Sequence, residues 1–359
     1  MSSDGYDPLG AEVREALVCV TGAGGFVGSQ LVRLLLAQGY RVRGTCRNPA
    51  KDKHLGLLPG AAERLTLVAA DLLTPGAFDD AFADVTTVMH TASPYVIDVK
   101  DPQAELVTPA VEGTLNVLGA AKNNPRIKRV VLTSSVAAVS DKPEKGKVLT
   151  ETDWNHTSTL RRNPYHFSKT LAEKAAWDFM RAERPNFDLA VINPAGVIGP
   201  SLSPALNSTN QIFADLFKGR YPAILGLTWS LVDVRDVALA HVLAMTTPRA
   251  KGRYLCAAAA LSMRDLVPLV AQHAIASDGG NRKKLPRRGL DGAFGNFLVR
   301  AILSRFQPRG SGSYLRTHIG RAYQFDTTRV RRELGLTFRP IEGSIRDTLD
   351  DLARWGHVP

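Results

Sequence analysis

The sequence predicts an α/β protein of the Rossmann type, a doubly wound parallel sheet with a smaller C-terminal substrate-binding lobe. Three observations lead to this prediction. Short β-branched runs alternate with helix-like segments through the first half of the chain. A glycine-rich turn follows the first of these runs directly. After residue 193, glycine, proline and arginine interrupt the regular alternation.

The alternation is regular from residue 16 to residue 193. Crossover helices join strands that run parallel, so the predicted strands belong to one parallel sheet. We expect these strands over residues 16–21, 40–46, 64–70, 85–90, 129–134 and 188–193. We expect helices over residues 27–38, 102–122 and 164–184.

The change after residue 193 suggests a division of the chain. Residues 12–194, with residues 230–256 returning to the first sheet, are expected to form the Rossmann domain, whose ligand is derived below. Residues 195–229 and 257–359 are expected to form the substrate-binding lobe.

One helix of the substrate-binding lobe is predicted by apolar residues at helical spacing. We expect its apolar side to pack in the core. The alternatives are that this side of the helix covers the substrate as a flap or rests on a membrane surface. The apolar residues are Phe294, Phe297, Leu298, Ala301, Ile302 and Phe306.

Composition narrows the class of protein. A chain of 359 residues, 44% hydrophobic and 22% charged, can bury a full core. The start is polar, and no apolar run approaches the ~18 residues of a membrane span, so we expect a cytoplasmic protein. Three widely separated cysteines, Cys19, Cys46 and Cys256, suggest neither disulfides nor a metal site.

The net charge of +11 belongs to one late segment, residues 282–332, which holds thirteen Lys or Arg against two Asp. We interpret this segment as the solvated surface of the substrate-binding lobe. The alternative interpretations are that this segment binds an anionic substrate or an acidic membrane surface. Nucleic acid is not an expected partner, because the segment contains no recognisable nucleic-acid-binding module.

The glycine-rich turn predicts a dinucleotide site. Gly22 allows the tight turn, Gly25 lets the backbone approach a pyrophosphate, and Gly28 lets helix and strand pack closely. Backbone amides at the helix start, around Phe26 and Val27, are free to face the phosphates.

The end of the second predicted strand distinguishes the two nicotinamide cofactors. NAD enzymes usually place a carboxylate there for the ribose 2′-hydroxyl, whereas NADP enzymes offer a cation to the 2′-phosphate. Here Arg47 stands at that position, no carboxylate is present, and Lys51 adds positive charge nearby. We therefore predict NADP(H).

A tyrosine and a lysine predict the proton donor. Tyr165 and Lys169 stand four residues apart on one face of a predicted helix. An unperturbed phenol has a pKa of about 10, and a neighbouring ammonium favours the phenolate, which brings proton exchange toward neutral pH. Ser135 follows the strand over residues 129–134, where its hydroxyl can bind a carbonyl oxygen. Ser134 is the other candidate for this role. For either serine, the structural alternative is that its hydroxyl only caps a helix or a turn.

With these motifs the chain resembles the extended short-chain dehydrogenase/reductase family, in the branch of dihydroflavonol 4-reductase, cinnamoyl-CoA reductase and microbial aldehyde reductases. The resemblance runs from Leu17 to about Trp355. It rests on the glycine turn, on Tyr165 to Lys169, and on residues 46–49, 71–72, 90–94, 113–117, 193–200, 232–238 and 252–254.

The resemblance implies further cofactor contacts. It implies that Asp71 and Leu72 hold the adenine, that Thr91, Ala92 and Ser93 line the cofactor, that Lys169 also binds the nicotinamide ribose, and that Pro194 and Val197 flank the nicotinamide.

The expected activity is NADPH-dependent reduction of an aldehyde or ketone to an alcohol. Ser135 polarises the carbonyl oxygen, Tyr165 donates the proton, and Lys169 tunes Tyr165. The partner is a small carbonyl compound, anionic or hydrophobic, and the protein is expected as a monomer or homodimer without membrane contact. The alternatives are an NAD-dependent nucleotide-sugar epimerase or dehydratase, and a steroid or sterol dehydrogenase at a membrane surface.

Overall fold

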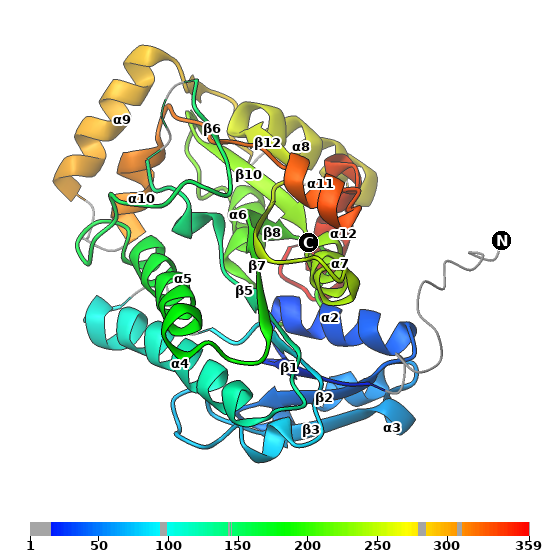
Figure 1. Ribbon diagram of the computed structural model, residues 1–359. Helices are drawn as coiled ribbons and strands as arrows, with labels where there is room; N and C mark the ends of the chain where they lie inside the picture. The colour runs from blue at the N-terminus through cyan, green and yellow to red at the C-terminus, as the bar shows by residue number, and fades with distance from the viewer. Residues whose placement is uncertain are drawn as a thin grey trace.

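The first part of the chain forms a seven-stranded parallel sheet (Figure 1). The computed structural model describes residues 16–93, 99–142, 144, 146–278, 285–306 and 311–358. The strand order is β11-β7-β5-β4-β1-β2-β3, and every neighbouring pair is parallel. The strands are β1 (Leu17–Thr21), β2 (Arg41–Cys46), β3 (Leu65–Ala69), β4 (Thr87–His90), β5 (Arg129–Thr133), β7 (Asp188–Pro194) and β11 (Gly252–Cys256). The predicted doubly wound fold is confirmed.

The order of the strands reverses at β1. Val18 of β1 pairs with Val42 of β2 on one side and with Thr87 of β4 on the other. The chain then extends outward to β3 in one direction and to β11 in the other. Such a reversal opens a crevice at the carboxyl ends of the strands, where ligands bind in open α/β sheets.

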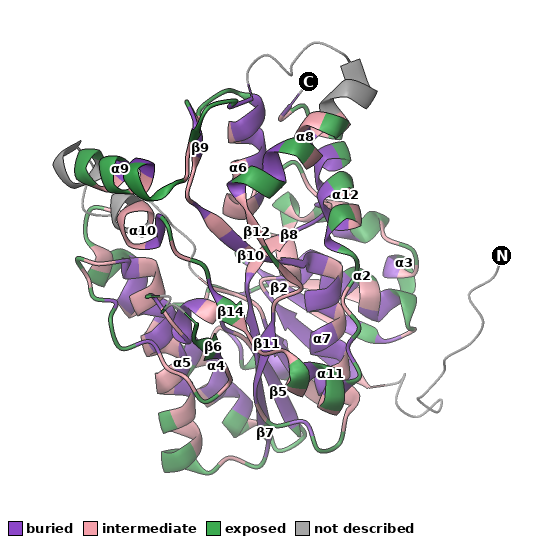
Figure 2. Cartoon of the chain, turned by 90° about the horizontal axis from the view of Figure 1, so that it is seen from above, coloured by how far each residue is buried: buried purple, intermediate pink, exposed green. Residues whose placement is uncertain are grey.

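Helices cover both faces of this sheet (Figure 1). Val18 and Val20 pack with α2 (Phe26–Ala37) and α7 (Val234–Thr246), whereas Cys19 between them packs with α4 (Thr108–Asn123) and α5 (Pro164–Glu183). Alternate residues of a strand point to opposite faces, so a strand covered on both faces is apolar throughout. Figure 2 shows the sheet buried between helices whose outer sides are exposed.

The helix expected over residues 102–122 has an irregular start. A π-helical turn, Gln103–Val107, precedes α4. Pro109 has no backbone N–H, so it cannot donate to the carbonyl four residues earlier, and the regular ladder is interrupted there.

A smaller mixed sheet lies in the second half of the chain. It contains β8 (Gly196–Ile198), β10 (Thr228–Asp233) and β12 (Ala259–Ser262). β10 is parallel to β8 and antiparallel to β12. Of residues 230–256, therefore, the end of β10 belongs to this smaller sheet, α7 covers the large sheet, and β11 is the edge strand of the large sheet.

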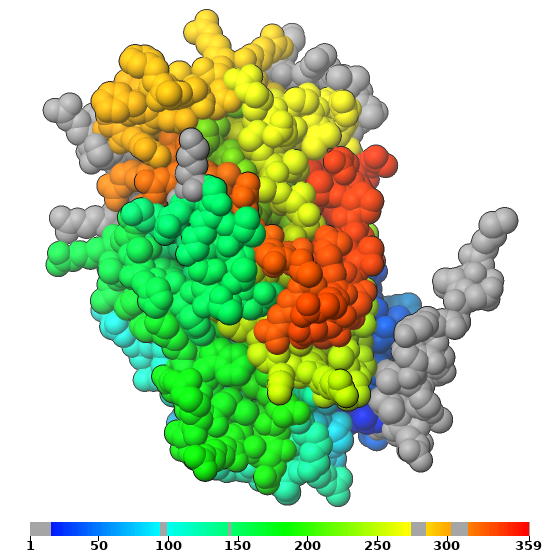
Figure 3. All heavy atoms as spheres, turned by 45° about the horizontal axis from the view of Figure 1, so that its top comes forward, coloured from blue at the N-terminus to red at the C-terminus, as the bar shows by residue number. Residues whose placement is uncertain are grey.

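Helices of the second half pack around the smaller sheet. They are α6 (Ser208–Phe217), α8 (Met263–Asp278) and α12 (Ile341–Arg354), and they share one apolar core with β8 and β10. Figure 3 shows late residues, coloured gold, at one end of the molecule and earlier residues, coloured green and cyan, at the opposite end.

Several short elements complete the fold, and the β6–β14 pair joins its first half to its second. Two small parallel pairs form, one between β9 and β13 and one between β6 and β14. The remaining elements are η1 (Pro49–Lys51), η2 (Lys53–Leu57), α3 (Ala61–Arg64), η3 (Asp80–Phe82), η5 (Val136–Ala138), β6 (Val148–Leu149), β9 (Ile224–Leu225), β13 (Gly289–Leu290), α10 (Ser311–His318), β14 (Gln324–Phe325) and α11 (Thr328–Leu334).

The helix predicted by apolar spacing in the second lobe is α9 (Ala293–Phe306), but its predicted burial is wrong. Phe294 is 78% exposed and Phe297 is 71% exposed, and Leu298 and Ile302 are also exposed. Among the side chains of α9 that the structure describes, Val299 is buried; the side chain of Phe306 lies outside the described ones. Helical spacing sets which residues share a face, not whether a partner covers that face.

The late basic segment is described in part, because residues 282–284 and 307–310 lie outside the described residues. Arg287 and Arg288 within it are exposed. None of the helices in the described part of the chain has the length and apolar character to cross a bilayer. The three cysteines are buried and free.

Candidate active site

The residues expected to bind cofactor gather at one edge of the large sheet, the edge formed by the carboxyl ends of its strands. This is the edge at which open α/β sheets bind ligands. Gly22 follows β1, Arg47 follows β2, Asp71 comes shortly after β3, Thr91 follows β4, Ser135 comes shortly after β5, and Pro194 is the last residue of β7.

The glycine turn leaves no room for side chains. Gly22 has φ +67°, and a Cβ added there would stand 2.8 Å from the Cα of Ala92. A Cβ on Gly28 would stand 2.3 Å from the Gly22 carbonyl oxygen, and one on Gly25 would stand 3.2 Å from it. Helix α2 begins at Phe26 and Val27 without a side-chain cap on its first amides. This bare, positively polarised cradle fits a pyrophosphate.

The end of β2 carries the charges expected to select the cofactor. Arg47 and Lys51 are both exposed there. The structure adds a carboxylate that the sequence reasoning missed: a Cβ on Gly24 would stand 2.1 Å from Asp52 Oδ1, so the Asp52 side chain lies against the glycine turn. Asp52 follows η1, and the short helix folds this later residue back toward the turn.

Asp71 and Leu72 lie beyond β3. Asp71 is exposed, and its Oδ1 accepts a hydrogen bond from the Leu73 amide at 2.9 Å. Leu72 packs against α4, because a Cβ on Gly113 would stand 2.4 Å from Leu72 Cγ. The carbonyl of Leu72 also accepts from Asn116 Nδ2 at 3.0 Å. Both residues are thus held at the outer part of the sheet edge.

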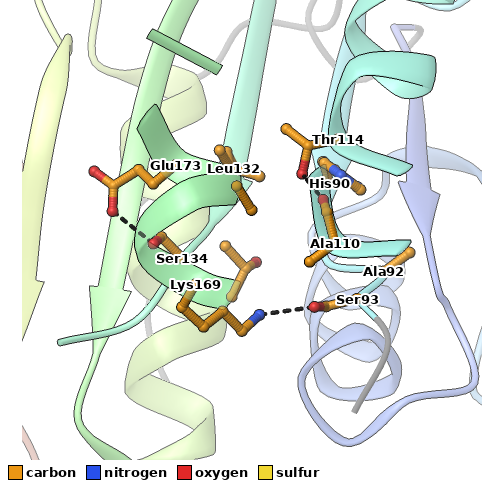
Figure 4. Close-up of a pocket in the computed structure, with 11 residues that line it drawn as sticks. His90, Ala92, Ser93, Ala110, Thr114, Leu132, Ser134, Lys169 and Glu173 are labelled. Atoms are coloured by element: carbon orange, nitrogen blue, oxygen red, sulfur yellow. Dashed lines mark hydrogen bonds between the residues drawn. The ribbon is translucent and has the colours of Figure 1, made fainter. Parts of the chain in front are cut away.

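The segment after β4 is fastened to the glycine turn. Thr91 Oγ1 donates to the Thr21 carbonyl at 2.6 Å, and the Ala92 amide donates to Thr21 Oγ1 at 3.2 Å. Ser93 extends this segment toward α5, where its Oγ accepts from Lys169 Nζ at 2.8 Å (Figure 4).

Tyr165 and Lys169 lie at the start of α5, on one face. Lys169 Nζ is 5.9 Å from the centroid of the Tyr165 ring. Lys169 is buried, and this burial lowers its pKa from 10.5 to about 8, while the nearby Glu173 carboxylate opposes the shift. A buried ammonium beside a phenol stabilises the phenolate, and this brings proton transfer from the phenol toward neutral pH.

The two serines after β5 have different environments. Ser135 Oγ accepts from the Ala137 amide at 3.1 Å and caps η5. This cap uses an acceptor position of the hydroxyl and leaves its proton available for donation. Ser134 is buried, and its Oγ donates to Glu173 Oε2 at 2.6 Å. The short helix η5, which Ser135 caps, packs against α5, the helix that carries Tyr165.

Two further predicted residues lie where the chain leaves the large sheet. Pro194 ends β7 and is buried, and Val197 lies in β8, opposite Val232 of β10. The connection from β7 to β8 is therefore the point at which the chain passes from the large sheet to the smaller one.

The start of α5 is also held by the smaller lobe. Asn163, which precedes α5 with φ +48°, donates through Nδ2 to Thr317 Oγ1 at 3.0 Å. The ring centroids of His166 and His318 are 5.9 Å apart. Helix α10 of the lobe thus contacts the turn that carries Tyr165.

A small cavity lies beside Lys169, between α4 and α5 (Figure 4). Its volume is about 10 Å³, close to the minimum for one water. Ser93, Ser134 and Glu173 are among its lining residues. Glu173 was missed by the sequence reasoning, although its position four residues after Lys169 places it on the face of Tyr165.

Comparisons with known proteins define the class. A model of the NAD dependent epimerase/dehydratase family matches residues 18–257. The chain belongs to this family and, within it, to the extended short-chain dehydrogenase/reductases, a group of oxidoreductases with a Rossmann fold.

Particular relatives confirm the branch. Cinnamoyl-CoA reductase CAD2 of Medicago truncatula is 47% identical over 66% of this chain and 74% of its own length. Tetraketide alpha-pyrone reductase 1 of Arabidopsis thaliana is 37% identical over 95% of this chain and 96% of its own. The structure of yeast methylglyoxal/isovaleraldehyde reductase Gre2 complexed with NADPH has a TM-score of 0.78 at 29% identity, and covers 95% of this chain and 100% of that one.

Proposed function

We propose that this protein reduces an aldehyde or ketone to an alcohol with NADPH. The observation that carries the proposal is the pair formed by Tyr165 and Lys169, with Nζ 5.9 Å from the phenol ring, at the edge of the sheet that also carries the glycine turn. Relatives whose names describe reductases support it. When bound, the dihydronicotinamide supplies the hydride.

The side chains of this protein bind and protonate the carbonyl oxygen. Ser135 donates a hydrogen bond to that oxygen while its own Oγ accepts from Ala137. Tyr165 transfers its phenolic proton to the same oxygen as negative charge develops there. Lys169 stabilises the phenolate that is left, because an adjacent ammonium favours the charged form.

The remaining predicted residues would hold the cofactor. The amides around Gly22, Gly25, Phe26, Val27 and Gly28 would bind the pyrophosphate, because a Cβ would clash at Gly22 and Gly28 and would be tight at Gly25, which keeps the backbone bare there. Arg47 and Lys51 would contact the 2′-phosphate, and Asp71 and Leu72 would hold the adenine. Lys169 would bind the nicotinamide ribose, and Pro194 and Val197 would flank the nicotinamide. Thr91, Ala92 and Ser93 would line the cofactor between these parts.

A substrate panel tests the proposal. Purified protein is mixed with NADPH and with aliphatic aldehydes, aromatic ketones or CoA thioesters, and consumption of NADPH is followed by absorbance. We expect turnover with at least one small carbonyl compound, anionic or hydrophobic, and none when Tyr165 is replaced by Phe. If the whole panel is inert while NADPH binds, carbonyl reduction is not the function.

A nucleotide-sugar epimerase or dehydratase is the first rival, because the family model includes such enzymes. An epimerase regenerates its cofactor in each cycle and therefore holds NAD tightly. Mass spectrometry of denatured protein separates the two functions. Co-purifying NAD supports the rival, whereas a freely exchanging NADPH supports the reductase.

A steroid or sterol dehydrogenase at a membrane surface is the second rival, and the exposed apolar face of α9 favours it. Phe294 and Phe297 belong to the basic segment 282–332, which also includes exposed Arg287 and Arg288. Exposed aromatics next to cations suit an anionic bilayer. Co-sedimentation with phosphatidylserine vesicles, lost in Phe294→Ser/Phe297→Ser, would support this rival; no binding at low salt would remove it.

A further inference from the structure

The carboxylate of Glu173 is buried one helical turn from Lys169. The side chain of Glu173 has 0% exposure, and the two residues stand four positions apart on α5. The proposed chemistry assigns this carboxylate no role. A carboxylate in the interior is costly unless its oxygens are paired, so its surroundings are informative.

Four side chains surround the Glu173 carboxylate, one from α5 itself and three from strands of the large sheet or the residue after one. Ser134 Oγ donates to Oε2 at 2.6 Å, and Asn193 Nδ2 donates to the same oxygen at 2.7 Å. Arg253 Nε lies 2.6 Å from Oε1, and Trp177 Nε1 donates to Oε1 at 3.2 Å. Glu173 therefore joins α5 to the ends of β5 and β7 and to β11.

Two of these contacts fix the segment that carries Ser135. Ser134 is its immediate neighbour, and Asn193 Nδ2 also lies 3.2 Å from the Ser135 carbonyl oxygen, to which it donates. Glu173 thus holds the end of β5 against the helix that carries Tyr165. Figure 4 shows the Ser134–Glu173 contact beside the Lys169–Ser93 contact.

We propose that Glu173 is a positioning residue that holds Ser135 in place relative to Tyr165 and Lys169 and keeps the Lys169 ammonium charged, with Arg253 as its buried counter-charge. The inference rests on the proposed function and adds a residue to the same site.

The charges around Lys169 agree with this role. Burial lowers the pKa of Lys169 to about 8, and Glu173 acts in the opposite direction. From β4, His90 lines the same cavity, and burial lowers its pKa to about 3, so it is neutral. From α4, uncharged Ala110 and Thr114 line the cavity. Among the described groups that line this cavity, Glu173 thus supplies the negative charge that favours the ammonium.

Arg253 is anchored independently of Glu173. Its Nη1 donates to the carbonyls of Glu151 at 3.0 Å and Asp153 at 2.6 Å. Its guanidinium lies 4.0 Å from the centroid of the Trp154 ring. Arg253 therefore stays in place when Glu173 changes, and loss of the carboxylate leaves a buried cation without its partner, which destabilises the fold.

The experiment separates positioning from stability with a matched control. Glu173→Gln keeps the size of the side chain and removes its charge. The control is Asp236→Asn, which removes another buried carboxylate. Asp236 lies on α7, has 0% side-chain exposure and pairs with Arg339, which precedes α12. Both variants are expected to lower Tm. Measured below both Tm values, Glu173→Gln should lose about 10- to 100-fold in kcat, and Asp236→Asn should keep its kcat within about twofold of wild type.

A binding measurement provides a second readout that needs no turnover. NADPH affinity, followed by fluorescence across pH, is expected to fall as Lys169 loses its proton. In Glu173→Gln this fall should move to lower pH, and in Asp236→Asn it should not move. A change of stability alone would leave its position unaltered.

The inference would be overturned if folded Glu173→Gln kept the wild-type kcat and if the pH dependence of its NADPH affinity stayed where it is in the wild-type protein. If Glu173→Gln does not fold, Ser134→Ala removes a single hydroxyl and keeps the ion pair; an unchanged kcat in that variant would also refute the positioning role. Failure of the proposed function looks different, because then the wild-type protein itself would turn over none of the carbonyl compounds of the panel.

Discussion

Lys169 Nζ donates to Ser93 Oγ at 2.8 Å and thereby connects α5 to the segment after β4. The same segment is fastened to the glycine turn through Thr21 and Ala92. The proposed proton donor and the proposed phosphate cradle are therefore parts of one hydrogen-bonded unit. A shift of α5 would move Tyr165 relative to the bound cofactor.

The first prediction concerns the proton donor. Tyr165→Phe removes the phenolic proton and leaves the ring, so kcat should fall by at least ~10²-fold, in the range typical of general acid catalysis. The Kd for NADPH should change little. Steady-state kinetics and fluorescence titration measure the two effects, with Tyr221→Phe in the smaller lobe as the control. Near-normal turnover would reject the role.

The second prediction concerns the cofactor. Arg47 is exposed at the end of β2, and a charge-assisted hydrogen bond to a phosphate contributes about 1.5–3 kcal/mol. Arg47→Ala should raise KM for NADPH by about 10- to 100-fold and leave KM for NADH nearly unchanged. Arg126→Ala, an exposed arginine before β5 at the opposite edge, serves as control. Equal losses with both cofactors would exclude selection by Arg47.

The third prediction concerns Asp52, whose carboxylate lies against Gly24 of the glycine turn. A negative charge at that position repels the phosphates, and at ~4 Å in water the interaction is about 1 kcal/mol. Asp52→Asn should therefore lower KM for NADPH about two- to fivefold at low salt, with a smaller effect at high salt. Asp84→Asn, at the amino end of β4, is the control; a raised KM for Asp52→Asn would show that the carboxylate supports binding instead.

The fourth prediction concerns pH. Because burial lowers the pKa of Lys169 to about 8, the free enzyme loses this ammonium as pH rises through that value rather than through 10.5. The value of kcat/KM for NADPH, which reports on the free enzyme, should decline above about pH 8. A constant kcat/KM up to pH 10 in stopped-flow measurements would contradict the assignment.

The fifth prediction concerns acid stability. His241 is buried, its Nε2 lies 2.6 Å from Thr133 Oγ1, and burial lowers its pKa from 6.5 to about 4. Below pH 6.5 the unfolded chain binds a proton there that the folded chain does not, so the free energy of unfolding falls with falling pH until about pH 4. Between pH 7 and 5 this site should account for about 2 kcal/mol.

His241→Gln tests this account. The pH dependence of its free energy of unfolding, measured with urea, should be less steep than that of wild type by the stated amount. His156→Gln changes an exposed histidine and should keep the wild-type slope. The same slope in all three proteins would mean that His241 takes no part in acid unfolding.

Much of the fold follows from local patterns. The strands ending at Thr21, Cys46 and His90 were predictable because apolar strands and a glycine turn leave strong local signals. The exposure of Phe294 and Phe297 was not, because the pattern within a helix says nothing about the surface it meets.

The hydrogen-bond network around Glu173 could not be predicted from the sequence for a related reason. Its spacing from Lys169 is visible in the sequence, but Ser134, Asn193 and Arg253 come from three separate strand ends. Only the order of the strands brings them together. Asp52 was missed in the same way, since the fold of η1 returns it to the turn.

The pairing of Glu173 with Arg253 has a consequence for synthesis on the ribosome. The arginine follows the glutamate by 80 positions, on the last strand to join the large sheet. While the nascent chain is still too short to include Arg253, the Glu173 carboxylate lacks the counter-charge with which it pairs in the interior. We therefore expect truncated products that stop before β11 to be recognised by proteases and chaperones, not released as incomplete enzymes.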